Sequence, residues 1–363
     1  MKNIMGNALT VTLFGESHGA AIGVVIDGIS PGIKVDVEYI KAKLEQRKPY
    51  GKGSTKRREP DVPEILSGVF NGYTTGTPLT IIIKNCDTKS GDYEGTRYLA
   101  RPSHADLTAF YKYGGFEDFR GGGHFSGRIT AALVAAGAIL MKALEDKGIY
   151  IGTHIKNCHG VLDRDFEDYE KDVKILAGLQ FPVLENKDAM QEEILKAADQ
   201  GDSVGGILET AIVNMPCGIG EPWFDTIESM LAHGLFSIPA VKGVEFGAGF
   251  KMADMKGSEA NDSFKYEKDC IITSTNNNGG INGGISNGMP IVFRTAVKPT
   301  PSIYKEQKTV DFEKKENAKL VIHGRHDPAI IHRARTVVDS VTALVIADLL
   351  IIHSGTDYFR SEI

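Results

Sequence analysis

Two long apolar segments constrain the fold of this chain more than any other feature. Residues 129–147 are rich in Ala, Leu and Met and are followed by Gly148, which predicts a helix that is buried on most sides. Residues 336–353 predict the final helix, and its Asp339 and Asp348 must face either water or a partner. The apolar part of this segment, with its charges, is too short to span a bilayer, so we expect no membrane association.

The remaining elements are short. Runs rich in β-branched residues predict strands at 8–14, 22–29, 77–84 and 291–297. Amphipathic segments predict helices at 37–47, 185–199 and 225–235. In the first of these helices Asp36 is the expected N-cap, and Val37, Ile40 and Leu44 share one face. No linker rich in Pro or Ser and no repeat divides the chain, so we expect one domain over residues 1–363.

Charge and cysteine usage exclude several classes of protein. The net charge of −6 argues against a surface that binds nucleic acid throughout, although a local basic patch is compatible with it. The four cysteines are far apart and form no C-x-x-C pair, which indicates neither a disulfide framework nor a zinc site. His154 and the pair Cys158–His159 have no further ligands at metal spacing, so we expect no metal. The N-terminal ten residues lack an apolar run typical of a signal peptide, and we expect a cytoplasmic protein.

Glycine is the one unusual component. The chain has 41 glycines in 363 residues, which is about 11 % against a usual share of about 7 %. Many lie beside His, Arg and Ser in the segments 15–19, 51–53, 121–127 and 279–288. Glycine lets backbone come close to a ligand, so we expect these loops to surround a binding site.

The segment GESHG at 15–19 formally matches the nucleophile elbow of serine hydrolases. An elbow needs a helix after the serine, whereas a strand-like segment follows Ser17, so a Ser17 hydrolase is an alternative that the local context disfavours. His18 is a candidate proton donor or phosphate ligand because imidazole titrates near neutral pH. The alternative for His18 is a turn residue bonded to backbone.

Basic clusters favour an anionic ligand. The run 41–58 contains eight Lys or Arg and one acid, and its cations suit a phosphate or a polycarboxylate. Within it, a solvated helix face is the simpler explanation of Lys41 and Lys43. The glycines of segment 120–128 precede the helix at 129, where backbone N–H groups and the helix dipole favour an anion.

Two further loops hold candidate acids and bases. In 101–106, proline fixes a turn that presents Arg101 and His104, although His104 could instead pair with Asp106. In 324–328, Asp327 stands beside a histidine and near three arginines, so it is either a base or part of a structural ion pair.

Taken together and in this order, these clusters resemble the chorismate synthase family. The matching segments are GESHG at 15–19, REPD at 58–61, RPSHAD at 101–106, RGGG at 120–123, GDSVGG at 201–206, GEPWFD at 220–225, GGINGGISNG at 279–288, KPTPS at 298–302 and GRHDP at 324–328. They extend over nearly the whole chain, so their joint specificity is much higher than that of any one motif.

The resemblance implies a fold and a reaction. The fold is α+β, a β-α-β sandwich with antiparallel sheets around central helices, assembled as a homotetramer. The reaction is the anti-1,4 elimination of phosphate from 5-enolpyruvylshikimate 3-phosphate, which gives chorismate in aromatic amino acid biosynthesis. It requires reduced FMN, with NADPH as a candidate reductant of the flavin. A flavin-binding protein without catalysis is the second alternative, which the presence of all three candidate acid–base residues disfavours.

The resemblance also implies residue roles. His18 acts as proton donor at the leaving phosphate, His104 steadies the reduced flavin, and Asp327 works with Ser126 as a base. The substrate-binding arginines implied are Arg47, Arg101, Arg128 and Arg333. The implied FMN contacts are His124, Phe125, Ser126, Pro239, Ala240, Gly283, Lys298, Pro299, Thr300, Pro301, Ser302 and Arg325.

This chain departs from the family pattern near the triple glycine. The family usually reads RGGGRSSARETA where this chain reads RGGGHFSGRITA at 120–131. His124 and Phe125 replace an arginine and a serine. We therefore expect a weaker positive charge at position 124 and a contact between Phe125 and the flavin ring. Ser103 also stands where the family usually has glycine.

Overall fold

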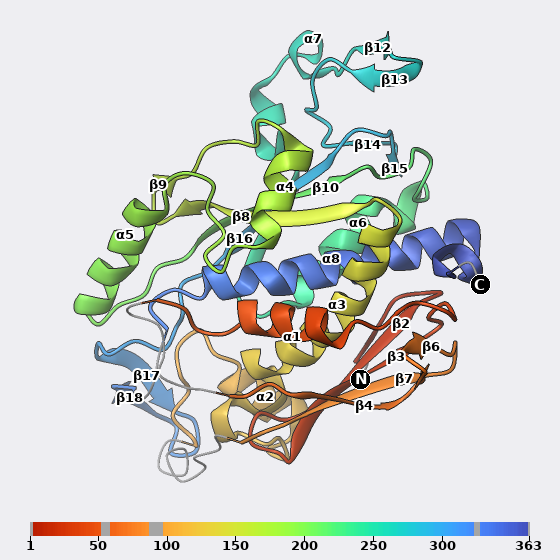
Figure 1. Ribbon diagram of the computed structural model, residues 1–363. Coiled ribbons are helices and arrows are strands. Elements are labelled where there is room, and N and C mark those ends of the chain that lie inside the picture. The colour runs from red at the N-terminus through yellow and green to blue at the C-terminus, as the bar shows by residue number, and fades with distance from the viewer. Residues whose placement is uncertain (1–2, 52–58, 87–96, 323–326, 362–363) are drawn as a thin grey trace.

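A layer of helices lies between two five-stranded antiparallel sheets (Figure 1). The computed structural model describes residues 3–51, 59–86, 97–322 and 327–361. The first sheet has the order β1-β2-β3-β7-β4, with β1 at Ile4–Met5, β2 at Thr10–Gly15, β3 at Ala21–Asp27, β7 at Leu79–Lys84 and β4 at Pro63–Ser67. The second has the order β11-β16-β10-β8-β9, with β11 at Val241–Phe246, β16 at Ile291–Val297, β10 at Gly206–Val213, β8 at Tyr150–Cys158 and β9 at Val161–Leu162.

Four helices form the middle layer, namely α1 at Val37–Gln46, α3 at Thr130–Asp146, α6 at Ile227–Ser237 and α8 at Ile331–Ser354. The peripheral helices are α2 at Asp106–Tyr113, α4 at Tyr169–Ala177, α5 at Lys187–Asp199 and α7 at Gly257–Ala260, and α4 packs on β8 and β10. Short 3₁₀ segments are η2 at Arg120–Phe125, which its three glycines interrupt, η3 at Gly127–Ile129, η4 at Trp223–Asp225, η5 at Gly249–Asp254 and η6 at Thr356–Phe359. The β-α-β sandwich expected from the resemblance is therefore confirmed.

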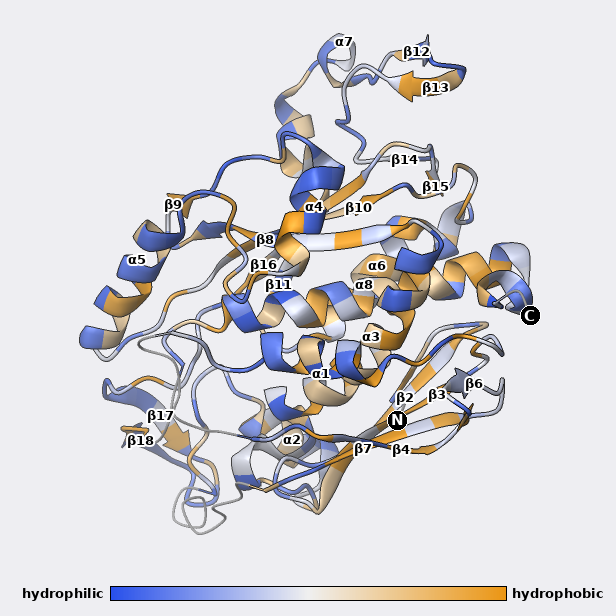
Figure 2. Ribbon diagram, in the orientation of Figure 1, coloured by the Kyte–Doolittle hydropathy of each residue, from blue (hydrophilic) through white to orange (hydrophobic). Residues whose placement is uncertain are grey.

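Small two-stranded hairpins lie outside the two large sheets. They are β5–β6 at Val69–Phe70 and Tyr73–Thr74, β12–β13 at Phe264–Glu267 and Cys270–Thr273, β14–β15 at Ile281–Asn282 and Ile285–Ser286, and β17–β18 at Gln307–Asp311 and Glu316–Leu320. Figure 2 shows apolar residues concentrated on the strands of the large sheets and on the helices between them. Burial of these faces supplies the core.

The two apolar segments that constrain the fold become α3 and α8, which pack against each other in the centre. Helix α8 begins at Ile331, five residues before the expected start, because the charged residues of its first turns are buried by pairing rather than left in a loop. Gly127–Asp146 and Ile331–Ser354 are each long and apolar enough to cross a membrane by length and composition, but 89 % of each apolar window is buried inside the molecule. The expectation that the second segment is too short was therefore wrong. Burial within the molecule, rather than insufficient length, accounts for its apolar character.

Both aspartates of α8 face partners. Asp348 accepts hydrogen bonds from the backbone N–H groups of Asn7, Ala8 and Leu9 at 2.8–2.9 Å, which ties the start of the first sheet to the end of α8. Asp339 accepts a hydrogen bond from the Thr153 hydroxyl at 2.6 Å. Each carboxylate is 1 % exposed, so these bonds replace the water that burial removes.

Helix α1 confirms one expectation and corrects another. Asp36 caps it by accepting a hydrogen bond from the backbone N–H of Tyr39 at 3.0 Å. Lys43 is not on a solvated face but is 4 % exposed, with its ammonium 5.1 Å from the centre of the Tyr39 ring. Val37 is the exposed member of the predicted apolar face, at 40 %. The buried face of α1 is thus rotated toward Lys43, because acidic groups on α3 and α8 compensate its charge.

A buried histidine links the strands of the second sheet. His154 Nδ1 lies 2.9 Å from Asp163 Oδ2, and His154 Nε2 lies 3.1 Å from Glu209 Oε2. Burial alone would lower the pKa of His154, but its bonds to these two carboxylates outweigh burial and raise that pKa above its usual value. Across the described ranges, no group of three or more His, Cys, Asp or Glu residues could hold a metal ion.

The pKa of a second buried histidine is shifted in the opposite direction. His332 in α8 is 3 % exposed, stacks on the Phe181 ring, and has no hydrogen-bond partner for either ring nitrogen in the described part of the chain. Burial, and then the charge of Arg333, lower its pKa from 6.5 to about 4. The unfolded chain therefore binds a proton more readily than the folded one, and stability contributed by the neutral ring is lost as the pH falls from 6.5 toward 4.

Replacing His332 with leucine is expected to remove this loss. The free energy of unfolding of His332→Leu relative to the wild type should rise by about 2 kcal/mol between pH 7 and pH 5, measured by urea unfolding at both values. His353→Leu, at an exposed histidine of the same helix, is the control and should show no such change. An equal pH response of the wild type and His332→Leu would contradict the assignment.

Candidate active site

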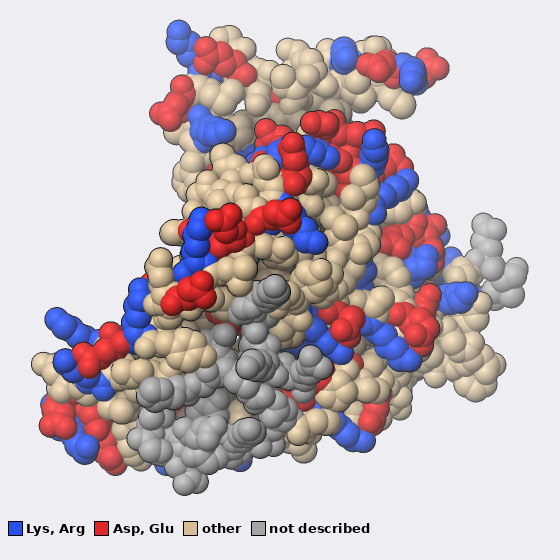
Figure 3. All heavy atoms as spheres, turned by 60° about the vertical axis from the view of Figure 1, so that its left-hand side comes forward, with Lys and Arg blue, Asp and Glu red and all other residues tan. Residues whose placement is uncertain are grey.

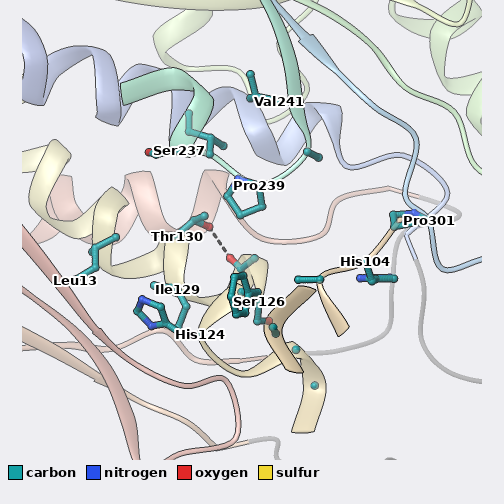
Figure 4. A pocket seen from close by; sticks show the side chains of 18 of the residues that line it. Leu13, His104, His124, Ser126, Ile129, Thr130, Ser237, Pro239, Val241 and Pro301 are labelled. Atoms are coloured by element: carbon teal, nitrogen blue, oxygen red, sulfur yellow. Dashed lines mark hydrogen bonds between the residues drawn. The ribbon is translucent and has the colours of Figure 1, made fainter. Parts of the chain in front are cut away.

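A pocket of about 760 Å³ opens between the first sheet, the start of α3 and the end of α6. Ten of the predicted site residues line it, namely Arg101, His104, His124, Phe125, Ser126, Pro239, Ala240, Lys298, Thr300 and Pro301. Figure 4 shows Ser126 between His124 on one side and His104 with Pro301 on the other, while Pro239 faces them across the pocket. Segments more than 170 residues apart in the chain thus converge on one cavity.

The triple glycine forms one wall of this pocket. All three residues have positive φ, at +59°, +86° and +52° for Gly121, Gly122 and Gly123. A Cβ on Gly121 would stand 2.1 Å from Cε1 of His18, so only glycine lets the histidine pack against this turn. The turn is joined to segment 15–19 by a hydrogen bond from Ser17 N–H to the Gly123 carbonyl at 3.1 Å. Two of the glycine-rich segments therefore meet as expected.

Three arginines gather beside the pocket around two carboxylates. Arg47 and Arg128 both bind Asp61, with Arg47 Nη2 2.8 Å from Asp61 Oδ2, and Arg333 pairs with Asp327. Arg333 Nε also donates a hydrogen bond to the Arg47 carbonyl at 3.0 Å. This arginine cluster, defined here as Arg47, Arg128 and Arg333, reaches the pocket through the lining residue Thr130, whose hydroxyl lies 3.4 Å from Arg47 Nη1.

Arg47 keeps its charge although it is buried. Burial lowers the pKa of Arg47 to about 10, which leaves the guanidinium charged at neutral pH. Burial alone would raise the pKa of Asp61, but the charges of Arg47 and Arg128 outweigh it and hold that pKa below its usual range. Two guanidinium groups, Arg47 and Arg128, therefore share the one carboxylate Asp61, and this excess of positive charge favours an anionic ligand.

His104 is held from the segment 298–302. Its Nε2 lies 2.8 Å from the Ser302 hydroxyl, while Lys298 Nζ donates a hydrogen bond to the Ser103 carbonyl at 2.7 Å. Asp106 is the other candidate partner of His104. Its carboxylate accepts hydrogen bonds from Arg101 Nε at 2.8 Å and from Arg101 Nη2 at 2.7 Å. Burial would raise the pKa of Asp106, but its hydrogen bonds with Arg101 and the charges of Arg101 and His104 lower it, so Asp106 interacts with both cations of this loop.

The remaining predicted residues fall into three groups. His18, Arg47 and Arg128 lie against the lining residues Gly121, Thr130 and Ser126, whereas Asp327 and Arg333 do not line the pocket and are linked to it through Arg47. Pro299 and Ser302 flank the lining residues Thr300 and Pro301. Gly283 lies in the turn of β14–β15 next to η4 and does not line this pocket, so segment 279–288 is not brought to it. Arg325 and most of segment 51–53 lie outside the described residues.

The hydrolase alternative requires a strand, a turn and then a helix around Ser17. Ser17 instead lies in the turn between β2 and β3, is fully buried, and bonds to the Arg120 carbonyl and the His18 ring. A buried hydroxyl between two strands cannot present itself as the nucleophile of an elbow. The Ser17 hydrolase reading is therefore wrong.

Two side chains of the site were not predicted. Asp61 lies within the REPD segment and is 3 % exposed, yet nothing in its local sequence indicates that it joins Arg47 to Arg128. Asn85 accepts a hydrogen bond from Arg128 Nε at 3.0 Å and donates to the carbonyls of Glu16 and Gly19. Both contacts join residues distant in sequence, so only the folded chain brings them together.

Ser103, which replaces the usual glycine, adopts φ of +60°. L-residues other than Asn and Asp are strained in this region, so Ser103→Gly is expected to raise the free energy of unfolding by roughly 0.5–1 kcal/mol. Urea unfolding measures this, with Ser258→Gly in α7 as the control that should lower stability. A fall in stability for Ser103→Gly would show that the serine is not strained there.

The fold and the pocket together define a class of protein: a β-α-β sandwich with a largely apolar cavity beside the arginine cluster, suited to small anionic ligands. A family model described as chorismate synthase matches residues 9–351. The chorismate synthase of Thermococcus gammatolerans is 50 % identical over 349 residues, covering 95 % of this chain and 97 % of that protein. That of Dehalococcoides mccartyi is 47 % identical over 352 residues, covering 96 % of each.

Solved structures agree with these relatives. A crystal structure of a chorismate synthase superposes with a TM-score of 0.75 at 29 % identity, covering 97 % of this chain and 94 % of the other. The chain belongs to the chorismate synthase family.

Proposed function

We propose that this protein eliminates phosphate from 5-enolpyruvylshikimate 3-phosphate to form chorismate, as a carbon–oxygen lyase of aromatic amino acid biosynthesis. The observation that carries the proposal is the arginine cluster beside the pocket, in a chain of this family. A substrate with one phosphate and two carboxylates needs several fixed cations, and Arg47, Arg128 and Arg333 are fixed by Asp61 and Asp327. Arg101, held by Asp106, adds a cation at the pocket itself.

Fixed cations also assist the chemistry. As phosphate leaves, negative charge grows on its oxygens, and preorganised guanidinium groups stabilise that charge without reorganisation. We assign His18 as the donor that protonates the leaving phosphate, since it packs against Gly121 at the pocket wall. We assign Asp327, together with Ser126, as the base of the reaction. The Ser126 hydroxyl already accepts the backbone N–H of Arg128 at 3.3 Å, which fixes its position.

The pocket has the features that FMN needs. Leu13, Ile129 and Pro239 give it apolar walls for a flat ring. Lys242 and Lys298 give it two neighbouring cations for a phosphate, and burial together with Lys242 lowers the pKa of Lys298. The Thr300 hydroxyl lines the pocket and is buried without a hydrogen-bond partner among the described residues, which suits a ligand oxygen.

When bound in reduced form, FMN supplies the electron-rich ring nitrogen that takes the hydrogen lost by the substrate. The residues of this chain would bind and orient it. His104, fixed by Ser302, would steady the negative charge of the ring, and Phe125, 42 % exposed at the pocket, would pack against it. His124, fixed by the Gly15 carbonyl at 2.8 Å, would occupy the place of the family's arginine. Gly283, which does not line this pocket, and Arg325, which lies outside the described residues, stay predictions as FMN contacts, and NADPH stays a candidate reductant.

We also propose a single domain, a homotetramer and a cytoplasmic enzyme. One continuous core joins both sheets to the same helices, which supports one domain over residues 1–363. Trp223 and Phe224 on η4 are 83 % and 90 % exposed, which supports contact with further copies of the chain. Acidic and basic side chains are interspersed over the face in Figure 3, which supports a small-molecule substrate rather than nucleic acid.

The test is an anaerobic incubation of the protein with the phosphate ester and FMN reduced by dithionite. Release of phosphate together with chorismate is expected, and omission of FMN or use of oxidised FMN should abolish it. A preparation that binds FMN but releases no phosphate would instead favour the flavin-binding alternative without catalysis.

A further inference from the structure

A buried ion pair near the arginine cluster has no role in the proposed chemistry. Arg335 and Asp339, one turn apart on α8, are each 1 % exposed, with Nη1 of the arginine 3.4 Å from Oδ2 of the aspartate. Burial lowers the pKa of Arg335 and raises that of Asp339, as expected for charges removed from water. Such pairs are often no more stabilising than apolar residues of similar size. Stability alone therefore does not account for this pair.

The same guanidinium reaches the end of α1. Arg335 Nη1 donates a hydrogen bond to Gln46 Oε1 at 3.2 Å, and Nη2 donates one to the Leu179 carbonyl. Gln46 Nε2 in turn donates to the Ala177 carbonyl at 2.8 Å. The last turn of α1 is thus fixed to α8 and to the segment that follows α4.

The next residue along the chain is Arg47. Its backbone N–H closes α1 on the Lys43 and Leu44 carbonyls at 3.3 and 3.2 Å, and its own carbonyl receives Arg333 Nε. Arg333 lies two residues before Arg335 on α8. Arg47 at the end of α1 and Arg333 on α8 are therefore bonded to each other at the place where the two helices meet. The bond between Arg335 and Gln46 joins the same two helices next to this contact.

We propose that Arg335, held by Asp339 and bonded to Gln46, is a positioning residue that sets Arg47 against Arg333 for binding of the anionic substrate. The proposal rests on the proposed function, because the substrate in question is the one proposed there. It assigns no contact with that substrate to Arg335 itself. A guanidinium forms fixed bonds to several carbonyl oxygens at once, which neither lysine nor an apolar residue reproduces.

The main test is the double variant Arg335→Met/Asp339→Asn, which removes both charges of the pair at once and leaves Glu145 to compensate the buried Lys43. Its fold and melting temperature are checked by circular dichroism. With FMN bound, its Kd for 5-enolpyruvylshikimate 3-phosphate and its KM should rise about 10-fold or more, because misplaced binding groups lose affinity. Its kcat should fall as well, because the same guanidinium groups stabilise the leaving phosphate, while its Kd for FMN should remain near the wild-type value.

Three further variants separate positioning from general stability. Arg335→Lys keeps the charge without the planar group and should give an intermediate KM. Gln46→Leu removes the bonds from the end of α1 to Arg335 and to the Ala177 carbonyl, and it should raise KM in the same way. This variant carries the test if the double variant does not fold. Arg294→Met breaks a comparable link between Glu209 and Glu245 in the second sheet and should lower stability without changing KM.

The outcomes are distinct. A rise in substrate Kd and KM confined to the Arg335 and Gln46 variants supports the proposal. A folded double variant, or a Gln46→Leu variant, with wild-type KM overturns it, and so does a parallel loss of FMN affinity. If the wild-type protein itself binds no phosphate ester, the proposed function fails.

Discussion

Replacing Asp327 with asparagine is expected to lower kcat by about 100-fold or more, because general acid–base groups contribute about 10²–10⁴-fold and an amide cannot accept the proton. Asp327 is 7 % exposed and pairs with Arg333, so the isosteric amide should keep the local packing. Binding of FMN and of the phosphate ester should persist. The measurements are anaerobic steady-state rates together with the Kd of FMN and of substrate.

Asp172→Asn is the matched control for this variant. Asp172 also forms a buried pair with an arginine, Arg164, but on α4, which packs on the second sheet away from the pocket. Its kcat should equal that of the wild type even if its stability falls. A near wild-type rate for Asp327→Asn would remove Asp327 from the chemistry and leave it as a partner of Arg333.

The second large effect is on stability. Asp348→Ala is expected to lower the free energy of unfolding by roughly 3–5 kcal/mol, because it leaves three backbone N–H groups without the charged acceptor that they share. These groups belong to Asn7, Ala8 and Leu9, at the start of the first sheet, and Leu9 is 1 % exposed. Urea unfolding of the wild type and the variant gives the difference directly.

Two comparisons sharpen this prediction. Asp348→Asn keeps one acceptor oxygen and should lose less than Asp348→Ala. Asp27→Ala removes an exposed carboxylate that, among the described residues, accepts a hydrogen bond only from the next backbone N–H, and it should cost less than about 1 kcal/mol. Equal losses for Asp348→Ala and Asp27→Ala would show that the three-fold contact does not hold the N-terminal strand to α8.

Local sequence patterns predict the elements well and their burial less well. Strand β16 and helices α1, α3 and α5 lie within two residues of the predicted bounds, because apolar periodicity and capping residues act locally. The start of α8 was missed because Arg333 and Arg335 are polar in sequence. In the folded chain their charges are compensated by Asp327 and Asp339.

The candidate site shows the same division. The loop that carries His124 and Ser126 could be predicted from its glycines and its place before an apolar helix, and it does line the pocket. Asp61, which joins Arg47 to Arg128, could not, because its role arises only when α1 and the start of α3 come together. Lys43 was assigned to solvent for the same reason, since its compensating acids lie on other helices.

The most direct test of the central claim is the stoichiometry of the anaerobic reaction with reduced FMN. We predict one phosphate and one chorismate for each phosphate ester consumed, with the flavin still reduced at the end, because the elimination involves no net redox change. Consumption of the ester with phosphate but no chorismate, or with progressive oxidation of the flavin, would contradict the proposed reaction.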